Sequence, residues 1–485
     1  MILRVLGHSF QYECENLCRL FYPNEKIITT DTLDGEDPLT VSTRYENGIA
    51  YADLSIDGEN LSLSTETSDE DAELNLAKLI YRGLSEVTGY TPPWGVLTGV
   101  RPSKLMLRMI ESEGEEGAVK YFTDSLLVDS KKAELALTVA KAENEIVNSS
   151  SPESFSLYVS IPFCPSRCSY CSFVSHSIAN PSAKKLVPEY LDKLCEEIAY
   201  TGEIVKANGL KLESIYFGGG TPGVLEAPQF DKLACAIEKS FDISTLKEYT
   251  VEIGRPDTVT AEKLAMLKRH NVGRISINPQ TFNQETLDLI GRQHTVQMAV
   301  DAYRLARSYD FKCINMDLIA GLPGENFENF KDSLDTAIML APENITVHSL
   351  ALKRSSNLNK MGAQVAEGKE AAKMLDYTSA SLSKYGYSPY YMYRQSRCVG
   401  NLENVGWCKG DTRGFYNVIM MEECHTVLAV GAGGVTKLCE PGGTKVERIF
   451  NYKYPYEYIS GFDVILERKA GITDFYKQLS KKDVN

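Results

Sequence analysis

Long apolar runs are missing from this chain of 485 residues. No stretch reaches the roughly 18 uncharged apolar residues that a helix needs to cross a bilayer. The first residues, MILRVLGHSFQYECENL, turn polar at once, so the pattern of a secretory signal is absent as well. We therefore expect a cytoplasmic protein without a membrane span.

Positive charge is also in short supply. Lysine and arginine total 51 against 65 aspartate and glutamate residues, which gives a formal net charge of −14. A protein that binds nucleic acid needs a basic face, so we expect no nucleic-acid partner. Hydrophobic residues make up 43% of the chain, enough for large buried cores in two to four domains.

Cysteine is too sparse and too irregularly spaced for a disulfide framework, with twelve residues in the whole chain. In a reducing compartment the question becomes which cysteines bind metal or take part in chemistry. Internal repeats and low-complexity tracts are absent too, so the fold must be inferred from local patterns.

Turn signals near the start predict an N-terminal α+β domain over residues 1–150. The alternating runs of Thr40–Thr67 are broken by Asn47-Gly48 and Asp57-Gly58, which are strong hairpin signals. The polar segment Asn148–Ser154 has nothing to bury and is expected to be a linker.

Residues 151–383 alternate short apolar runs with amphipathic stretches, the pattern of a parallel sheet with right-handed crossovers. Unusual residues fall at the carboxyl ends of these runs, where parallel α/β barrels build active sites. We predict an α/β fold with a partial (βα)6 barrel of the TIM type, followed by a C-terminal capping region over residues 384–485. The six runs are Leu157–Phe163, Ser214–Phe217, Tyr249–Ile253, Arg274–Ile277, Cys313–Ile319 and Ile345–Leu350.

Cys164, Cys168 and Cys171 follow the first run with the spacing C-x3-C-x2-C. Three thiolates on one short loop suit three corners of a cubane iron–sulfur cluster and leave the fourth iron open. A structural zinc ion is an alternative, but it needs four ligands, and His176 is the nearby candidate for the fourth. Three packed thiols are a further alternative.

Two carboxylates, Glu252 and Asp317, stand in otherwise apolar strands. An unpaired buried carboxylate is costly, so a hydroxyl-rich ligand such as a ribose would explain both. Gly218-Gly219-Gly220 follows a run and would let a ligand approach the backbone closely. GGGTPG lacks the G-x-G-x-x-G fingerprint of dinucleotide sites, and taken alone it is equally consistent with a tight turn.

Six segments resemble, in order, the motifs of the oxygen-independent coproporphyrinogen III oxidase family of radical S-adenosylmethionine (SAM) enzymes. They are LYVSIPFC, YFGGGTP, VEIGRPD, RISINPQTFN, GRQH and INMDLIAGLPGE. The flanking segments WGVLTGVRPSK, YYMYRQ, GNLENVGW and VGAGGVTKL resemble the HemZ-type branch of that family. The resemblance is dense over Leu157–Leu352. It implies a radical SAM barrel, a 4Fe-4S cluster, SAM, and an electron donor such as flavodoxin or ferredoxin.

The resemblance also implies the site residues. Cys164, Cys168 and Cys171 would hold the cluster. Arg292 would bind the methionine carboxylate of SAM through its forked guanidinium, the alternative being a surface ion pair. The full set of implied SAM contacts is Tyr158, Tyr170, Phe173, Gly219, Gly220, Thr221, Glu252, Gln280, Arg292, Asp317 and Ala351.

The implied reaction is oxidative decarboxylation of two propionates of coproporphyrinogen III to give protoporphyrinogen IX in anaerobic haem biosynthesis. Two alternatives stay open: a haem-binding or haem-trafficking protein of the same superfamily, and a radical SAM enzyme that acts on haem itself. Two departures bear on the choice. Ser172-Phe173 stands where the oxidase branch has a fourth cysteine, and Ser160 stands where that branch often has histidine.

A tetrapyrrole with four carboxylates needs local cations in so acidic a protein. The candidates that flank the expected barrel mouth are Arg101, Lys104, Lys353, Arg354, Arg394 and Arg397. The tyrosines of Tyr385–Tyr393 offer flat apolar area for a macrocycle or for ordinary packing.

The remaining histidines and cysteines receive mostly structural interpretations. His348 and His425 are expected to be satisfied core or turn residues. Cys195, Cys235 and Cys313 lie on apolar faces and are expected in the core. An auxiliary cluster is a weaker hypothesis, because its four candidate ligands are separated by 9, 15 and 14 residues: Cys398, Cys408, Cys424 and Cys439.

Overall fold

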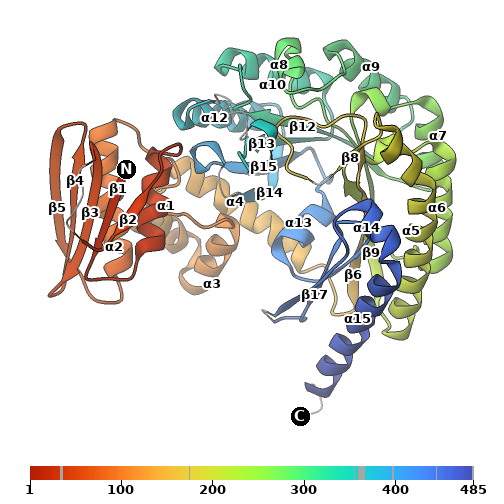
Figure 1. Cartoon of the computed structure of the whole chain (residues 1–485), viewed down its shortest axis with the longest axis horizontal. Coiled ribbons are helices and arrows are strands. Elements are labelled where there is room, and N and C mark those ends of the chain that lie inside the picture. Colours follow the sequence, from red (N-terminus) through yellow and green to blue (C-terminus); the bar gives the residue numbers. More distant parts are fainter. Residues whose placement is uncertain are drawn as a thin grey trace.

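A separate five-stranded sheet forms from the first residues of the chain, at the left of Figure 1. The structure, a computed structural model, describes residues 1–32, 37–173, 175–353, 356–358, 366–395, 398–443 and 445–482. The sheet has the order β2-β1-β3-β4-β5, and helix α2 (Ala72–Thr88) packs on β4 and β5. Its other elements are β1 (Ile2–Leu6), α1 (Gln11–Phe21), β2 (Ile28–Thr30), β3 (Leu39–Glu46), β4 (Ile49–Ile56) and β5 (Glu59–Glu66).

Two tight turns set the register of β3, β4 and β5. Asn47 and Gly48 have φ angles of 52° and 75°, and Asp57 and Gly58 have φ angles of 50° and 92°. Positive φ at both central residues produces the turn whose twist matches that of the flanking strands. The three strands pair antiparallel without a slip, so the predicted meander is confirmed.

Six parallel strands occupy the middle of a second, eleven-stranded sheet. Every predicted run coincides with one of them, and amphipathic helices cover the outer face (Figure 1). The predicted partial barrel is confirmed. The strands are β6 (Ser154–Ile161), β9 (Lys211–Gly219), β10 (Glu248–Gly254), β11 (Arg274–Ile277), β12 (Cys313–Ala320) and β13 (Asn344–Ser349). The helices are α5 (Pro181–Ala207), α6 (Ala227–Ser240), α7 (Ala261–Arg269), α8 (Gln284–Leu289), α9 (Val296–Arg307), α10 (Phe327–Leu340) and α12 (Gly368–Lys384).

The C-terminal part of the chain extends this sheet at both ends. Strand β15 (Glu403–Cys408) pairs antiparallel with β13, and β14 (Ser388–Arg394) pairs with β15. At the other end β16 (Thr426–Val430) pairs in parallel with β6, followed by β17 (Val435–Cys439) and β18 (Val446–Phe450). Helices α14 (Pro455–Ser460) and α15 (Phe462–Lys482) complete the chain. The division into domains at residues 150 and 383 remains our proposal.

Helix α13 (Phe415–Glu422) lies over the lumen between the two ends of the open barrel (Figure 1). Its Tyr416 ring stacks on Tyr216 of β9, with ring centroids 4.3 Å apart. Helix α4 (Ser130–Val147) packs against α13 and β14, and α3 (Pro102–Lys120) packs against α4. The open side of the barrel is therefore covered by helices from both ends of the chain.

A buried charge network fastens the N-terminal part to the barrel sheet. Glu403 of β15 is 1% exposed and accepts hydrogen bonds from Lys132 Nζ at 2.8 Å and from Trp94 Nε1 at 2.7 Å. Burial disfavours the charged form of Lys132, but the carboxylates of Glu403 and Asp376 raise its pKa overall. Arg394 of β14 lies 5.3 Å above the Trp94 ring. The WGVLTGVRPSK segment therefore helps to attach the N-terminal part of the chain to the barrel sheet.

Among the residues that the structure describes, none of the helices combines the length and the hydropathy that a membrane span requires.

Replacing Lys132 with methionine should destabilise the protein by about 3–5 kcal/mol, because Glu403 would stay buried without its cation. Anaerobic chemical denaturation measures the difference. Lys131→Met is the matched control, since Lys131 is exposed on the same helix. A loss below about 1 kcal/mol, the value of a surface pair, would show that Glu403 does not depend on this cation.

Candidate active site

A cavity of about 500 Å³ opens at the carboxyl ends of the parallel strands. Side chains from β6, β9, β10, β12 and β13 line it, together with residues of β14 and α13. The volume lies in the range of small-molecule and cofactor sites. The cavity occupies the rim of the barrel on which the sequence predicts an active site.

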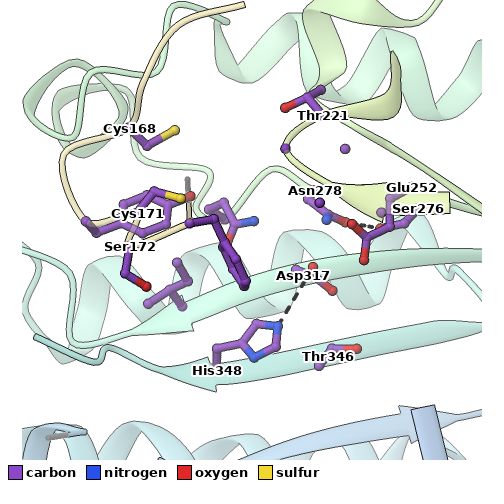
Figure 2. Close-up of a pocket in the computed structure, with 18 of the residues that line it drawn as sticks. Cys168, Cys171, Ser172, Thr221, Glu252, Ser276, Asn278, Asp317, Thr346 and His348 are labelled. Carbon is purple, nitrogen blue, oxygen red and sulfur yellow. Dashed lines mark hydrogen bonds and ion pairs between the residues drawn. The ribbon is translucent and has the colours of Figure 1, made fainter. Parts of the chain in front are cut away.

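The three cysteines of the C-x3-C-x2-C loop line one end of the cavity, and Figure 2 shows two of them, Cys168 and Cys171. Thr221 Oγ1 donates to Sγ of Cys164 at 3.4 Å, and the Arg292 guanidinium donates to Sγ of Cys168 at 3.9 Å. Burial raises the pKa of Cys171 to about 11. A metal must therefore displace the thiol proton when it binds this cysteine.

The donor set fits an iron–sulfur cluster better than a single zinc ion. The three sulfur atoms do not all lie within 4.8 Å of one another, whereas two thiolates on one zinc are at most about 4.6 Å apart when each Zn–S bond is about 2.3 Å. His176 packs its ring 6.1 Å from both Tyr454 and Tyr456 instead. Arg292 Nε is buried beside the loop without a hydrogen-bond partner, so a polar group fits there.

The glycine turn after β9 packs directly against the cysteine loop. Gly219 has a φ of 106°, a conformation that side chains with a Cβ rarely adopt. A Cβ on Gly220 would lie 2.5 Å from the Phe163 carbonyl oxygen and 3.0 Å from Cys164 Sγ. The Thr221 N–H donates to the same carbonyl at 2.7 Å. These glycines are therefore needed to seat the loop, in addition to any contact with a ligand.

Gln280 links two strand ends through strained backbone. Its φ is 70°, which is uncommon for a residue with a side chain. The Gln280 N–H donates to the Asp317 carbonyl at 2.9 Å, and its own carbonyl accepts from the Ile319 N–H at 2.9 Å. This short bridge places the Gln280 side chain in the cavity wall beside β12.

Glu252 and Asp317 face the cavity from β10 and β12 (Figure 2). Burial raises the pKa of Glu252 to about 7, and the nearby Asp317 carboxylate adds to the effect. Tyr216 donates a hydrogen bond to Glu252, while Asn315 Nδ2 donates to Asp317 at 2.8 Å. His348 Nε2 lies 3.8 Å from the Asp317 carboxylate. His348 therefore belongs to the cavity, contrary to our expectation of a core or turn residue.

The wall farther along the lumen is aromatic. The Tyr158 ring stacks on Tyr416 and on Tyr216, with ring centroids 6.1 and 6.3 Å apart. Tyr391 stacks on Tyr393 with centroids 6.2 Å apart. All five side chains line the cavity. Two methionines and two amides complete this wall: Met420, Met421, Asn404 and Asn417. The arrangement offers flat apolar area with hydroxyl groups at its edges.

The cations that the sequence singles out are mostly engaged elsewhere. Arg101 donates to the Met421 carbonyl at 3.0 Å and pairs with Glu423 at 3.3 Å. Arg394 is 3% exposed and donates to the carbonyls of Leu97 and Asn401 at 2.6 and 3.0 Å. The structure does not bring either residue, or Lys104, to the cavity. Lys353 does line it, whereas Arg354 and Arg397 lie outside the described residues.

The other predicted site residues do come together. Besides the three cysteines, the cavity is lined by Tyr158, Tyr170, Phe173, Gly219, Gly220, Thr221, Glu252, Gln280, Arg292, Asp317 and Ala351. Arg292 is 5% exposed and donates to Tyr170 at 3.0 Å and to the Asn278 carbonyl at 2.6 Å, so it is not a surface ion pair. Phe173 stands at the rim, 67% exposed.

The sequence pointed to Tyr158 and to the Tyr385–Tyr393 part of the aromatic wall, but it missed Tyr216, Tyr416 and two further arginines. Tyr216 could have been found, because strand alternation puts it on the same face as Gly218. Tyr416 gave no local signal, since its role depends on where a short helix docks. Arg167 and Arg255 also line the cavity, and Arg255 is committed to Asp257 through a bidentate pair at 2.9 Å.

The structure excludes the weaker hypothesis of an auxiliary cluster and corrects the interpretation of Cys235. Cys398 pairs with Ala351, just past the carboxyl end of β13, whereas Cys408 pairs with Asn344 at its start. Seven strand residues separate these points by about 20 Å, so the four C-terminal cysteines do not share one cluster. Cys235 is exposed rather than part of the core.

Ser160, two residues after Tyr158 on β6, is not among the residues that line the cavity. Its hydroxyl donates to the Ala432 carbonyl at 2.7 Å, and its own carbonyl accepts from Tyr190 at 2.8 Å. The VGAGG turn after β16 is thereby held against β6.

An open parallel barrel with a three-cysteine loop after its first strand defines a radical SAM protein. The sequence pattern of the Radical SAM superfamily matches residues 158–337. Among solved structures, coproporphyrinogen III oxidase (HemN) from Escherichia coli matches with a TM-score of 0.52 and 22% identity, covering 67% of this chain and 72% of HemN. This likeness shows the fold.

The particular family is shown by likeness along the whole chain. The oxygen-independent coproporphyrinogen-III oxidase-like protein HemZ of Bacillus subtilis is 35% identical over 475 residues, 96% of this chain and 94% of that protein. The chain belongs to the HemZ family of radical SAM proteins, and its cofactors are a 4Fe-4S cluster and SAM. The haem chaperone HemW of the same organism is 34% identical over 240 residues, 48% of this chain and 62% of HemW.

Glu252 should titrate near neutral pH. Its pKa of about 7 lies above the ordinary 4.5, so the carboxyl is mostly protonated at pH 6 and mostly ionised at pH 8. Infrared difference spectra of wild type minus Glu252→Gln should show a protonated-carboxyl band that disappears across this range. Asp317→Asn removes a neighbouring negative charge and should lower the midpoint. A midpoint near 4.5 in wild type would contradict the burial of this carboxyl.

Proposed function

We propose that this protein is a radical SAM oxidoreductase that converts two propionates of coproporphyrinogen III to vinyl groups, giving protoporphyrinogen IX. The main support is the continuity of one cavity from the cysteine loop to the tyrosine wall. The chain is also related over nearly its full length to a protein described as coproporphyrinogen-III oxidase-like.

In this proposal Cys164, Cys168 and Cys171 hold the cluster, and the residues on the adjoining strand ends hold SAM. Glu252 and Asp317 would accept hydrogen bonds from the ribose, and Arg292 would direct its unpartnered Nε towards the methionine carboxylate. The hydrogen bonds from Thr221 and Arg292 to cysteine sulfur would stabilise negative charge on the loop.

When bound, the cluster and SAM would supply a radical that takes a hydrogen atom from the propionate β-carbon. The substrate would then lose carbon dioxide and pass one electron to an external one-electron acceptor, which would leave the vinyl group. The tyrosine wall would hold the macrocycle flat and exclude water. An electron donor of the flavodoxin or ferredoxin class would reduce the cluster, and the reaction would take place in an oxygen-poor cytoplasm.

Substrate carboxylates would meet few cations in the described wall of the cavity. Arg167, Arg255, Arg292 and Lys353 line it. Arg167 belongs to the cysteine loop, Arg255 binds Asp257, and Arg292 contacts the loop. Lys353 follows β13 instead, and on this position we assign to it the recognition of a propionate.

A haem-trafficking protein is the second candidate. It is favoured by Ser172, which stands in the cavity wall where the oxidase branch has a cysteine, and by the relation to a haem chaperone over 240 residues. The small number of cations in the cavity also suits a ligand that is held mainly by its flat apolar face. The third candidate function is that of an enzyme that opens the haem ring.

Asp317→Ala should weaken SAM binding roughly 10- to 150-fold while the iron content stays the same. The reason is loss of a charge-assisted hydrogen bond of about 1.5–3 kcal/mol. Anaerobic equilibrium binding measures the affinity. Asp301→Ala is the matched control, because Asp301 is exposed on α9. Equal SAM affinities in the two variants would show that Asp317 does not contact SAM.

Anaerobic incubation with dithionite, SAM and each tetrapyrrole separates the candidate functions. The decarboxylase should release carbon dioxide and 5′-deoxyadenosine in fixed proportion to protoporphyrinogen IX, with a deuterium isotope effect at the β-carbon. Lys353→Ala should slow product formation but leave uncoupled SAM cleavage, whereas Lys369→Ala, at an exposed lysine of α12, should change neither.

Two other outcomes would point to the alternatives. Tight haem binding with coproporphyrinogen III recovered unchanged would favour the carrier, and a linear tetrapyrrole product would favour ring opening.

A further inference from the structure

A mixed group of metal-ligand side chains lies in the outer helical layer, apart from the cavity. Asp231 and Cys235 are four residues apart on α6, so they share one helix face, and His270 follows the last residue of α7. A carboxylate oxygen, the thiol sulfur and an imidazole nitrogen all lie within 4.8 Å of one another. Within the ranges that the structure describes, this is the one trio that meets that limit.

The imidazole of His270 is already oriented for such a role. The side chain is buried, its Nδ1 lies 2.7 Å from Glu238 Oε1, and its Nε2 lies 2.9 Å from Asp231 Oδ1. Glu238 comes from the same face of α6, three residues after Cys235. A carboxylate that accepts the Nδ1 proton fixes the tautomer whose Nε2 lone pair can bind a metal, as in many metal sites with histidine ligands.

We propose that Asp231, Cys235 and His270 bind one zinc ion, with Glu238 holding His270 and water in the fourth position. Oxygen, thiolate and imidazole together suit zinc, which accepts all three in a tetrahedral shell. Binding replaces the thiol proton of Cys235 and any proton on His270 Nε2, and both leave to solvent. The partial exposure of the group leaves an entry path for the ion.

The position of this group gives the ion a structural role. Helix α6 follows β9, which ends in the glycine turn, and α7 follows β10, which carries Glu252. A zinc ion between the two helices would hold together the supports of two neighbouring strand ends of the cavity. Arg269 also pairs with Asp231, so the metal must share this carboxylate with a cation.

Zinc binding is tested on protein whose cluster is fully loaded and whose iron is counted, so that the cysteine loop is occupied. Equilibrium dialysis against buffered zinc should give one zinc per chain without loss of iron. Zinc K-edge absorption should show one sulfur at about 2.3 Å and nitrogen or oxygen at about 2.0–2.1 Å.

Variants at the group sharpen the test. Cys235→Ala and His270→Ala should lose this site, and Glu238→Gln should weaken it about 10- to 100-fold. Arg269→Gln removes a competing cation and should tighten binding about two- to fivefold. Cys195→Ala is the matched control, because Cys195 is a half-buried free thiol outside the group, and it should bind zinc as the wild type does.

Two results would overturn the proposal. One is zinc with three sulfur neighbours accompanied by released iron, which would place the metal at the cysteine loop. The other is unchanged zinc affinity in Cys235→Ala, whose substitution at an exposed position tests the site without disturbing the core.

Discussion

Parallel pairing from β6 to β13 brings the carboxyl ends of six strands to one rim, so residues far apart in sequence meet around one cavity. Backbone geometry then refines their placement. The left-handed Gln280 ties two strand ends together, and the missing Cβ of Gly220 lets the cysteine loop sit against the turn after β9. The chemistry of the site therefore depends on strand direction first and on two unusual backbone positions second.

The open side of the barrel creates a second requirement. A sheet that does not close must have its lumen covered, and here α13 lies over it while α4 packs against α13. Burying Lys132 and Glu403, which join these parts, costs free energy because both ions lose water, and their pairing at 2.8 Å offsets that cost. Glu403 meets both a lysine and an indole N–H from the N-terminal part. The N-terminal segment thereby helps to enclose the cavity without lining it.

Much of this architecture was predictable because it depends on local patterns of residues in the sequence. The six strands are continuous apolar runs, the hairpins need positive φ at Asn-Gly and Asp-Gly, and the cysteine loop has a fixed spacing. What could not be predicted depends on tertiary contacts. The residues next to Arg394 in the sequence do not indicate that its guanidinium faces carbonyl groups. Those next to Tyr416 do not indicate that its helix lies over the barrel lumen. Cys235 has buried neighbours in Leu233, Ala234 and Ile237, yet the helical phase turns it outward.

The pairing of β16 with β6 also has a consequence for the order of events during synthesis. Ser160 and Ala432 are joined by a hydrogen bond across 272 residues of sequence. At about 5–20 residues per second, the ribosome needs roughly 15–50 seconds to make the second strand after the first. Throughout that interval the first barrel strand, which leads into the cysteine loop, lacks its neighbour on one side. Insertion of the cluster into a completed barrel must therefore wait until β16 and the turn at Ala432 have been translated.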